Sequence, residues 1–86
     1  MIESQILVDE RVNINHPEIE NENAVHAFKS MIRHKHRSTG EFVGVGVDDK
    51  SRLLEIVYKY NVFYDFFYIY HSQKATPKVL KEVGLI

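Results

Sequence analysis

Residues 42–47 alternate valine with glycine, and this alternation restricts the fold more than any other feature of the chain. The segment reads Phe-Val-Gly-Val-Gly-Val, with the period of two that is typical of a β-strand. Because glycine has no side chain to pack, only one face of this strand carries apolar bulk. A turn at Asp48-Asp49-Lys50-Ser51 separates it from apolar segments at residues 52–60 and 66–71. The pattern predicts three consecutive antiparallel strands.

Helical spacing appears on either side of these strands. Apolar residues recur on one face between residues 21 and 33, and Asn21 is the predicted N-cap of that helix. A second helix is predicted to start with Thr76 as N-cap and Pro77 at its first position, and to stop at Gly84. With a short first strand at residues 4–9, the order is strand, helix, three-stranded antiparallel meander, helix. This order predicts a single small α+β domain over residues 1–86, with the main helix on one face of the sheet.

One core is predicted between that helix and the sheet. A buried Glu55 without a partner would be costly, so Leu54 and Ile56 are expected to face the helix. The expected core members are Val43, Val45, Val47, Leu54, Ile56, Phe67, Ile69, Val25, Phe28, Met31 and Ile32. The opposite face of the sheet then gathers Glu55, Lys59, Tyr68 and Tyr70.

Composition excludes several classes of protein. The chain has 86 residues and no cysteine, so neither a disulfide framework nor a thiolate metal site is available. The N-terminus lacks a signal-peptide pattern, and no apolar run reaches the ~18–20 residues that span a bilayer. A cytoplasmic protein without a membrane partner is the expectation.

Two longer segments carry a resemblance to a known family. Residues 42–60, FVGVGVDDKSRLLEIVYKY, followed by residues 68–82, YIYHSQKATPKVLKE, resemble the small BrnT-type toxins of bacterial toxin–antitoxin operons. His16-Pro17-Glu18-Ile19 stands where that family has its His-Gly segment, and the resemblance spans roughly residues 14–83. It implies a truncated RelE-like fold and a metal-independent endoribonuclease that cleaves mRNA and needs no cofactor. It also implies a cognate antitoxin that masks the activity.

The chain departs from the family in two places. Lys74, Tyr58 and Thr76 match the family pattern, but Gln73 stands where the family usually has an arginine. Glutamine cannot grip a phosphate as a guanidinium does, so this change puts catalysis in doubt. The hairpin between the last two strands is also longer here.

Candidate catalytic residues follow from what RNA cleavage requires. The 2′-hydroxyl must lose a proton, the phosphate needs cations, and the leaving oxygen needs a proton. Glu55 is the candidate proton acceptor, and Lys59 and Lys74 are the candidate phosphate ligands. Tyr70 or His71 is the candidate proton donor. Tyr68 is a candidate for stacking on a base.

The cationic run Arg33-His34-Lys35-His36-Arg37 allows several interpretations. Flanking cations and the absence of nearby carboxylates argue against a metal site, and no metal is expected. Arg33, Lys35 and Arg37 are candidate contacts to the RNA backbone. The leading interpretation is a solvated helix end and loop.

A covered surface is also predicted. Phe66, Tyr68 and Tyr70 with Val57 and Leu53 form a larger apolar patch than a small monomer usually exposes. A second copy of the chain or an antitoxin is expected to cover it. Two other functions stay open: a non-catalytic protein-interaction module, and RNA binding without cleavage.

Overall fold

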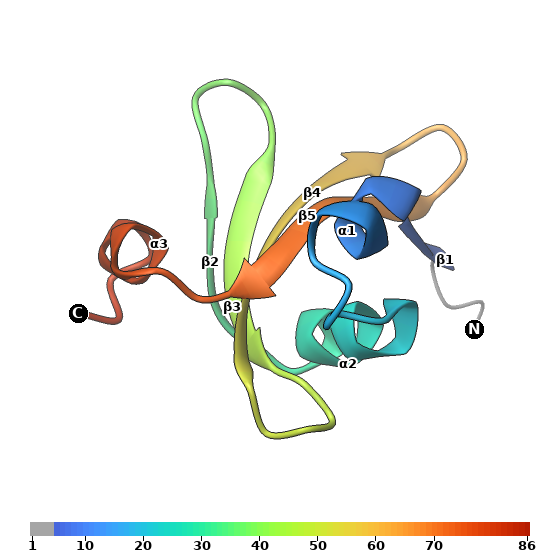
Figure 1. Cartoon of the computed structure of the whole chain (residues 1–86). Coiled ribbons are helices and arrows are strands. Elements are labelled where there is room, and N and C mark those ends of the chain that lie inside the picture. Colours follow the sequence, from blue (N-terminus) through green and yellow to red (C-terminus); the bar gives the residue numbers. More distant parts are fainter. Residues whose placement is uncertain (1–4) are drawn as a thin grey trace.

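The computed structural model describes residues 5–86, which form a five-stranded mixed sheet with helices on both faces (Figure 1). The elements in chain order are β1 (Gln5–Val8), α1 (Glu10–Asn15), α2 (Asn21–Lys29), β2 (Met31–His36), β3 (Phe42–Val47), β4 (Leu53–Asn61), β5 (Phe66–Lys74) and α3 (Pro77–Glu82). The strand order is β1-β5-β4-β3-β2, with β1 parallel to β5 and all other neighbours antiparallel. The α+β class is confirmed, but the sheet is larger than predicted. Within residues 5–86, no helix has the length and apolar character needed to cross a membrane.

The predicted helix at residues 21–33 begins at Asn21 as predicted but ends earlier, at Lys29, and has a different N-cap. Its N-cap is Glu20 rather than Asn21, and the Glu20 amide donates to Oδ1 of Asn23 at 2.8 Å. The Asn23 side chain then donates to Asp49 at 2.7 Å, which ties the start of α2 to the β3–β4 turn. The Asn23 side chain thus satisfies the amide of the N-cap residue Glu20, as in a capping box.

The cationic run belongs to an edge strand, so its interpretation as a helix end and loop was wrong. α2 ends at Lys29, and β2 pairs with β3 from Met31 to His36. A register shift between Met31 and Arg33 leaves Ile32 52% exposed. The prediction of Ile32 in the core is therefore wrong, and Val25 is only half-buried outside both core clusters.

The glycines of β3 face α2, and the valines face away from it. A Cβ atom at Gly46 would lie 2.0 Å from the Ala27 carbonyl oxygen, and one at Gly44 would lie 2.0 Å from the Met31 sulfur. α2 and the Met31 side chain therefore pack closely against β3 at its two glycines, which have no side chains. The prediction that Val43 and Val45 pack against α2 was wrong because the bulky face of β3 is covered by α3.

Two apolar clusters thus lie on opposite faces of the sheet. On the α1/α2 face, the predicted core residues Leu54, Ile56 and Ile69 are fully buried, and Phe28, Met31 and Phe67 pack against them. On the α3 face, the buried residues are Val43, Val45, Val57, Val79 and Val83. Val47 is half-buried and belongs to neither cluster.

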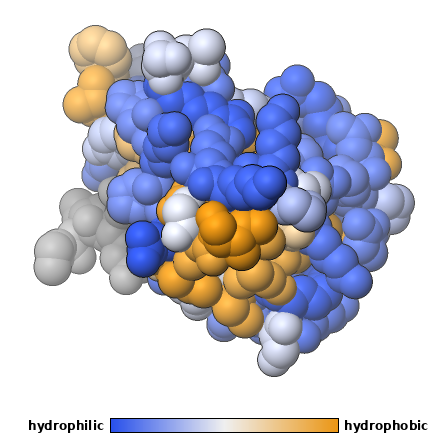
Figure 2. Space-filling view, turned by 90° about the vertical axis from the view of Figure 1, so that its left-hand side faces the viewer, coloured by the Kyte–Doolittle hydropathy of each residue, from blue (hydrophilic) through white to orange (hydrophobic). Residues whose placement is uncertain are grey.

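α3 begins and ends where the sequence predicts. Thr76 is the N-cap and accepts from the Val79 amide, Pro77 opens the helix, and Gly84 follows it with φ of 83°. Figure 2 looks onto this side and shows an apolar area within a mainly hydrophilic surface. In α3 and the residues after it, Leu80 and Leu85 are half-buried and Ile86 is exposed. A single short helix thus covers only part of this face of the sheet.

Candidate active site

A bulge in β5 brings together side chains that strict alternation would separate. Val57 pairs with His71 and Tyr58 pairs with Ile69, so Tyr70 is an extra residue without a partner in β4. An extra residue reverses the alternation of all side chains beyond it. His71 therefore leaves the face of Ile69 and joins the face of Glu55, while Ser72 becomes buried opposite Ile56.

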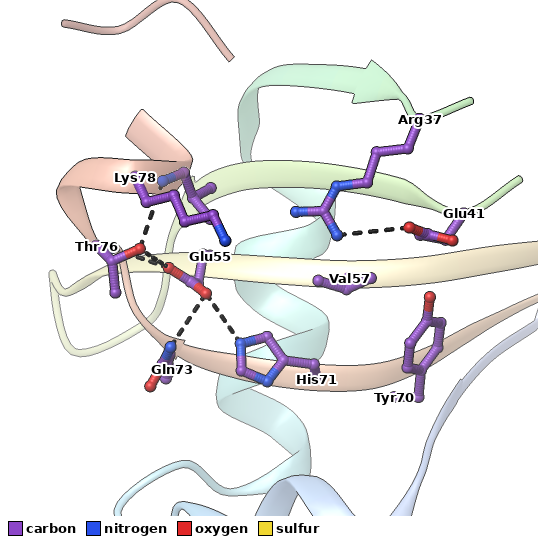
Figure 3. Close-up of a pocket in the computed structure, with 10 residues that line it drawn as sticks. Arg37, Glu41, Glu55, Val57, Tyr70, His71, Gln73, Thr76 and Lys78 are labelled. Atoms are coloured by element: carbon purple, nitrogen blue, oxygen red, sulfur yellow. Dashed lines mark hydrogen bonds and ion pairs between the residues drawn. The ribbon is translucent and has the colours of Figure 1, made fainter. Parts of the chain in front are cut away.

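Glu55 is the centre of a hydrogen-bonded cluster on this face. It is only 4% exposed, and its Oε1 accepts from the Thr76 amide at 2.9 Å and the Thr76 hydroxyl at 2.7 Å. Its Oε2 lies 2.9 Å from His71 Nε2 and accepts from Gln73 at 3.1 Å. The carboxylate thus joins the start of α3 to β5 (Figure 3).

These bonds determine the ionisation of Glu55. Burial raises the pKa of Glu55, but hydrogen bonds from Thr76, His71 and Gln73 outweigh burial and leave its pKa below the ordinary value. An ionised carboxylate can only accept hydrogen bonds, so the proton shared with His71 resides on Nε2. In the neutral imidazole, Nδ1 is then left as the acceptor.

An open pocket of about 640 Å3 lies beside this cluster. Arg37 and Lys78 extend their side chains over it from opposite sides, above Val57, and the Tyr70 hydroxyl points toward Glu41 and Arg37 (Figure 3). Burial and the nearby Glu41 carboxylate raise the pKa of Tyr70. The phenol therefore keeps its proton at neutral pH.

The Arg37 guanidinium is already paired within the protein. It donates to the two carboxylate oxygens of Glu82 at 2.7 and 2.8 Å, and lies 3.5 Å from Glu41. The hydrogen bond from Arg37 lowers the pKa of Glu82. A phosphate at this position must therefore compete with two carboxylates for Arg37.

A second polar cluster holds the Tyr68 side chain, on the same face of the sheet as Glu55. The Tyr68 hydroxyl donates to Asp9, whose carboxylate also accepts two bonds from the Arg11 side chain at 3.0 Å. Hydrogen bonds from Arg11 and Tyr68 keep the pKa of Asp9 well below its usual range. Tyr68 is thus held at its hydroxyl end.

The structure brings some of the predicted catalytic residues together and separates others. Glu55, Tyr70 and His71 line one pocket with Arg37. Lys59 does not line this pocket, but its Nζ lies 5.7 Å from the ring centroid of Tyr70, which does. Lys74 pairs with Leu54, whose side chain is buried on the α2 face, so alternation turns Lys74 away from Glu55.

The predicted RNA-binding and partner-binding residues also occupy defined places. Arg33 and Lys35 pair with Val45 and Val43, so they line the α3 side of β2 on the same face as Arg37. Phe66 and Tyr68 are half-buried on β5. Val57 does not add to an open patch, because it is buried in one cluster with Val79 of α3 and Val83, which follows that helix. The predicted exposed face is therefore smaller than expected.

Several residues of the pocket were not predicted from the sequence. Lys78 and Glu82 reach the pocket or its cation because α3 packs near the end of β2, and Glu41 lies beside Arg37 in the β2–β3 hairpin. Thr76 was predicted as a helix cap, and that role brings its amide and hydroxyl to Glu55. By contrast, family-matching Tyr58 is buried on the α2 face, where its ring stacks on Phe42.

Among residues 5–86, no three His, Asp or Glu side chains gather in an arrangement that could hold a metal ion. Comparison with protein-family models, curated proteins and solved structures found no match to this chain.

Proposed function

We propose that this protein is the toxin of a bacterial toxin–antitoxin pair, a metal-independent endoribonuclease that cleaves mRNA in the cytoplasm. The observation that carries the proposal is the Glu55–His71 contact of 2.9 Å in a pocket that also holds Arg37, Lys78 and Tyr70. A positioned base, a proton donor and cations are the groups that phosphodiester cleavage by a 2′-hydroxyl requires. The resemblance to BrnT-type toxins supports the toxin role and a truncated RelE-like fold.

We assign Glu55 a different role from that of the proton acceptor expected from the sequence. Its two oxygens already accept four hydrogen bonds, so Glu55 orients His71 rather than taking the proton from RNA. Holding the proton on Nε2 leaves Nδ1 of His71 to accept the proton of the 2′-hydroxyl.

The remaining steps follow from this assignment. The 2′-oxygen attacks the adjacent phosphorus, and Lys78 with Arg37 offsets the negative charge of the pentacoordinate state. The bond to the 5′-oxygen breaks, and Tyr70 donates its proton to that oxygen. The products are a 2′,3′-cyclic phosphate and a 5′-hydroxyl end, and water returns the proton of Tyr70 and removes that of His71.

The test compares two histidine variants of the purified chain. Single-stranded RNA is incubated in excess EDTA with wild type, His71→Gln and His34→Gln, and the product ends are analysed. His34 lies on the exposed edge strand β2 and is the matched control. We expect His71→Gln to lower the cleavage rate ~100-fold or more, and His34→Gln to leave it unchanged. Intact RNA with folded wild type, and no growth arrest on its induced expression, would reject the proposal.

A non-catalytic interaction module is the second candidate. The bidentate Arg37–Glu82 pair and the four bonds to Glu55 favour it, because these groups stabilise α3 and need no substrate. Gln73 in place of the family arginine favours it as well. Under this alternative, the wild type binds an antitoxin-like partner or a second copy of itself but leaves RNA intact.

A further inference from the structure

An aromatic stripe leads away from the candidate active site along β5. It consists of Phe66, Tyr68 and Tyr70 on the α3 side of the sheet; Tyr70 packs against the valine cluster at α3, and Phe66 and Tyr68 lie outside that cluster. Tyr70 lines the pocket that holds Glu55 and His71, and Phe66 and Tyr68 border a second hollow with Lys59. The stripe therefore runs continuously from the candidate site to the β4–β5 hairpin.

The rings of the stripe are held in place. The ring centroids of Tyr68 and Tyr70 are 6.5 Å apart and their planes differ by 24°. Asp9 accepts from the Tyr68 hydroxyl, and Tyr70 lies in the bulge of β5. Both rings are half-buried, so part of each ring remains accessible. Nearly parallel, fixed rings can stack on a planar group without a large loss of side-chain freedom.

A cation accompanies the two tyrosines. Lys59 is exposed, pairs with Tyr68 across β4 and β5, and has its Nζ 5.7 Å from the Tyr70 ring centroid. Within the described part of the chain, Lys59 forms no ion pair. Its charge is therefore available to a phosphate, unlike that of Arg37.

Aromatic rings beside a cation that has no ion pair are an arrangement that binds single-stranded nucleic acid. A duplex keeps its base faces stacked inside and cannot offer them to the rings. From this geometry we infer that the stripe binds the bases of single-stranded RNA next to the cleaved bond, with Tyr70 and Tyr68 stacking on bases and Lys59 contacting the phosphate between them. The inference extends the proposed function, since it makes single-stranded RNA the substrate of the same site.

Binding of an uncleavable strand tests this inference apart from catalysis. The probe is a short 2′-O-methylated RNA, single-stranded or annealed to its complement, titrated against the full chain. We expect the single strand to bind more tightly than the duplex. Tyr68→Leu and Tyr70→Leu should each weaken single-strand binding by roughly 5- to 150-fold, the effect of one lost stacked base. Tyr64→Leu is the control, because Tyr64 is 80% exposed in the hairpin turn, outside the stripe.

A second measurement uses only the wild type, so it tests the inference even if a leucine variant does not fold. In wild type, ring resonances of Tyr68 and Tyr70 should shift on titration with the single strand, while those of buried Tyr58 should not. Equal affinity for strand and duplex, or unchanged affinity in both folded leucine variants, overturns the inference. Loss of self-association with unchanged RNA affinity would make the stripe a protein interface and would also overturn it. If wild type binds the strand as expected but never cleaves unmodified RNA, the proposed function fails and the inference stands.

Discussion

His71 Nε2 lies 2.9 Å from the Glu55 carboxylate because Tyr70 is an extra residue in β5. Without that bulge, alternation would place His71 on the α1/α2 face with Ile69 and leave Glu55 with two donors fewer. The same carboxylate receives the first amide and the hydroxyl of the α3 cap. One buried charge thus connects the candidate catalytic histidine to the helix that closes the pocket.

Loss of the Glu55 carboxylate should destabilise the fold as well as the site. Glu55→Ala leaves the Thr76 amide and hydroxyl without their acceptor, and we expect the free energy of unfolding to fall by roughly 2–4 kcal/mol. Urea denaturation measures the change. Glu10→Ala, at an exposed position in α1, should change it far less. Equal midpoints for the two variants would show that the Glu55 cluster contributes little to stability.

Acid should weaken the protein through Glu55 and Asp48. Burial raises the pKa of Asp48, but bonds from the Arg52 and Lys50 amides and the Arg52 side chain outweigh it, so its pKa is lowered, as is that of Glu55. Stability from a lowered carboxyl pKa is present above the unfolded value of about 4 and is lost as pH falls through the folded value. We expect the free energy of unfolding to stay level from neutral pH to about 5 and to fall below about 4.

The acid prediction has an internal control. Asp48→Asn should be less stable than wild type at neutral pH, and should lose less stability than wild type on acidification. A wild-type free energy of unfolding that is unchanged on strong acidification would contradict the assignment of lowered pKa values to these two groups.

The two β3 glycines should differ in their tolerance of alanine. At Gly46 the added Cβ meets the Ala27 carbonyl, and at Gly44 it meets the Met31 side chain. Backbone cannot move as easily as a flexible side chain, so Gly46→Ala should cost roughly 1–3 kcal/mol and Gly44→Ala less. Thermal and urea unfolding of both variants provide the measurement. A reversed order would mean that α2 does not approach β3 as closely as described.

Removing the charge of Glu82 should free Arg37 from its ion pair. We expect this change to lower the stability of the fold and to raise its affinity for RNA. Glu82→Gln weakens the bidentate pair, which should reduce the free energy of unfolding by about 1 kcal/mol. Under the proposed function, the freed guanidinium gains a phosphate contact, so RNA binding should tighten and its salt dependence should steepen by roughly 0.7. Glu10→Gln removes the same charge on α1 and should do neither. Weaker RNA binding by Glu82→Gln would exclude Arg37 as a phosphate ligand.

Local chemistry made much of the fold predictable. Residues 42–47 form a strand because their alternation suits no other regular structure, and β3 has those limits. Thr76, Pro77 and Gly84 specify a helix start and stop through their own backbone preferences. The cost of burying Glu55 against apolar side chains correctly placed Leu54 and Ile56 under α2.

Predictions failed where the outcome depends on contacts between distant segments. Met31 and Ile32 fit the helical period, yet pairing with β3 draws residues 31–36 into an edge strand. The valine face of β3 could be covered by either helix, and the close approach of Ala27 to Gly46 assigns it to α3. The candidate site was predicted in part: Glu55, Tyr70 and His71 were named, but Lys78, Glu41 and Glu82 were not.

The sequence by itself therefore determined the α+β class, the three central strands, the closing helix and several residues of the candidate site. The hydrophobic period and helix capping depend on residues that are close together in the chain, so they can be predicted without the fold. Only the tertiary structure decided which face of β3 is covered by which helix, and that β5 bulges at Tyr70. These choices depend on packing and pairing between segments far apart in sequence, and the bulge places His71 against Glu55.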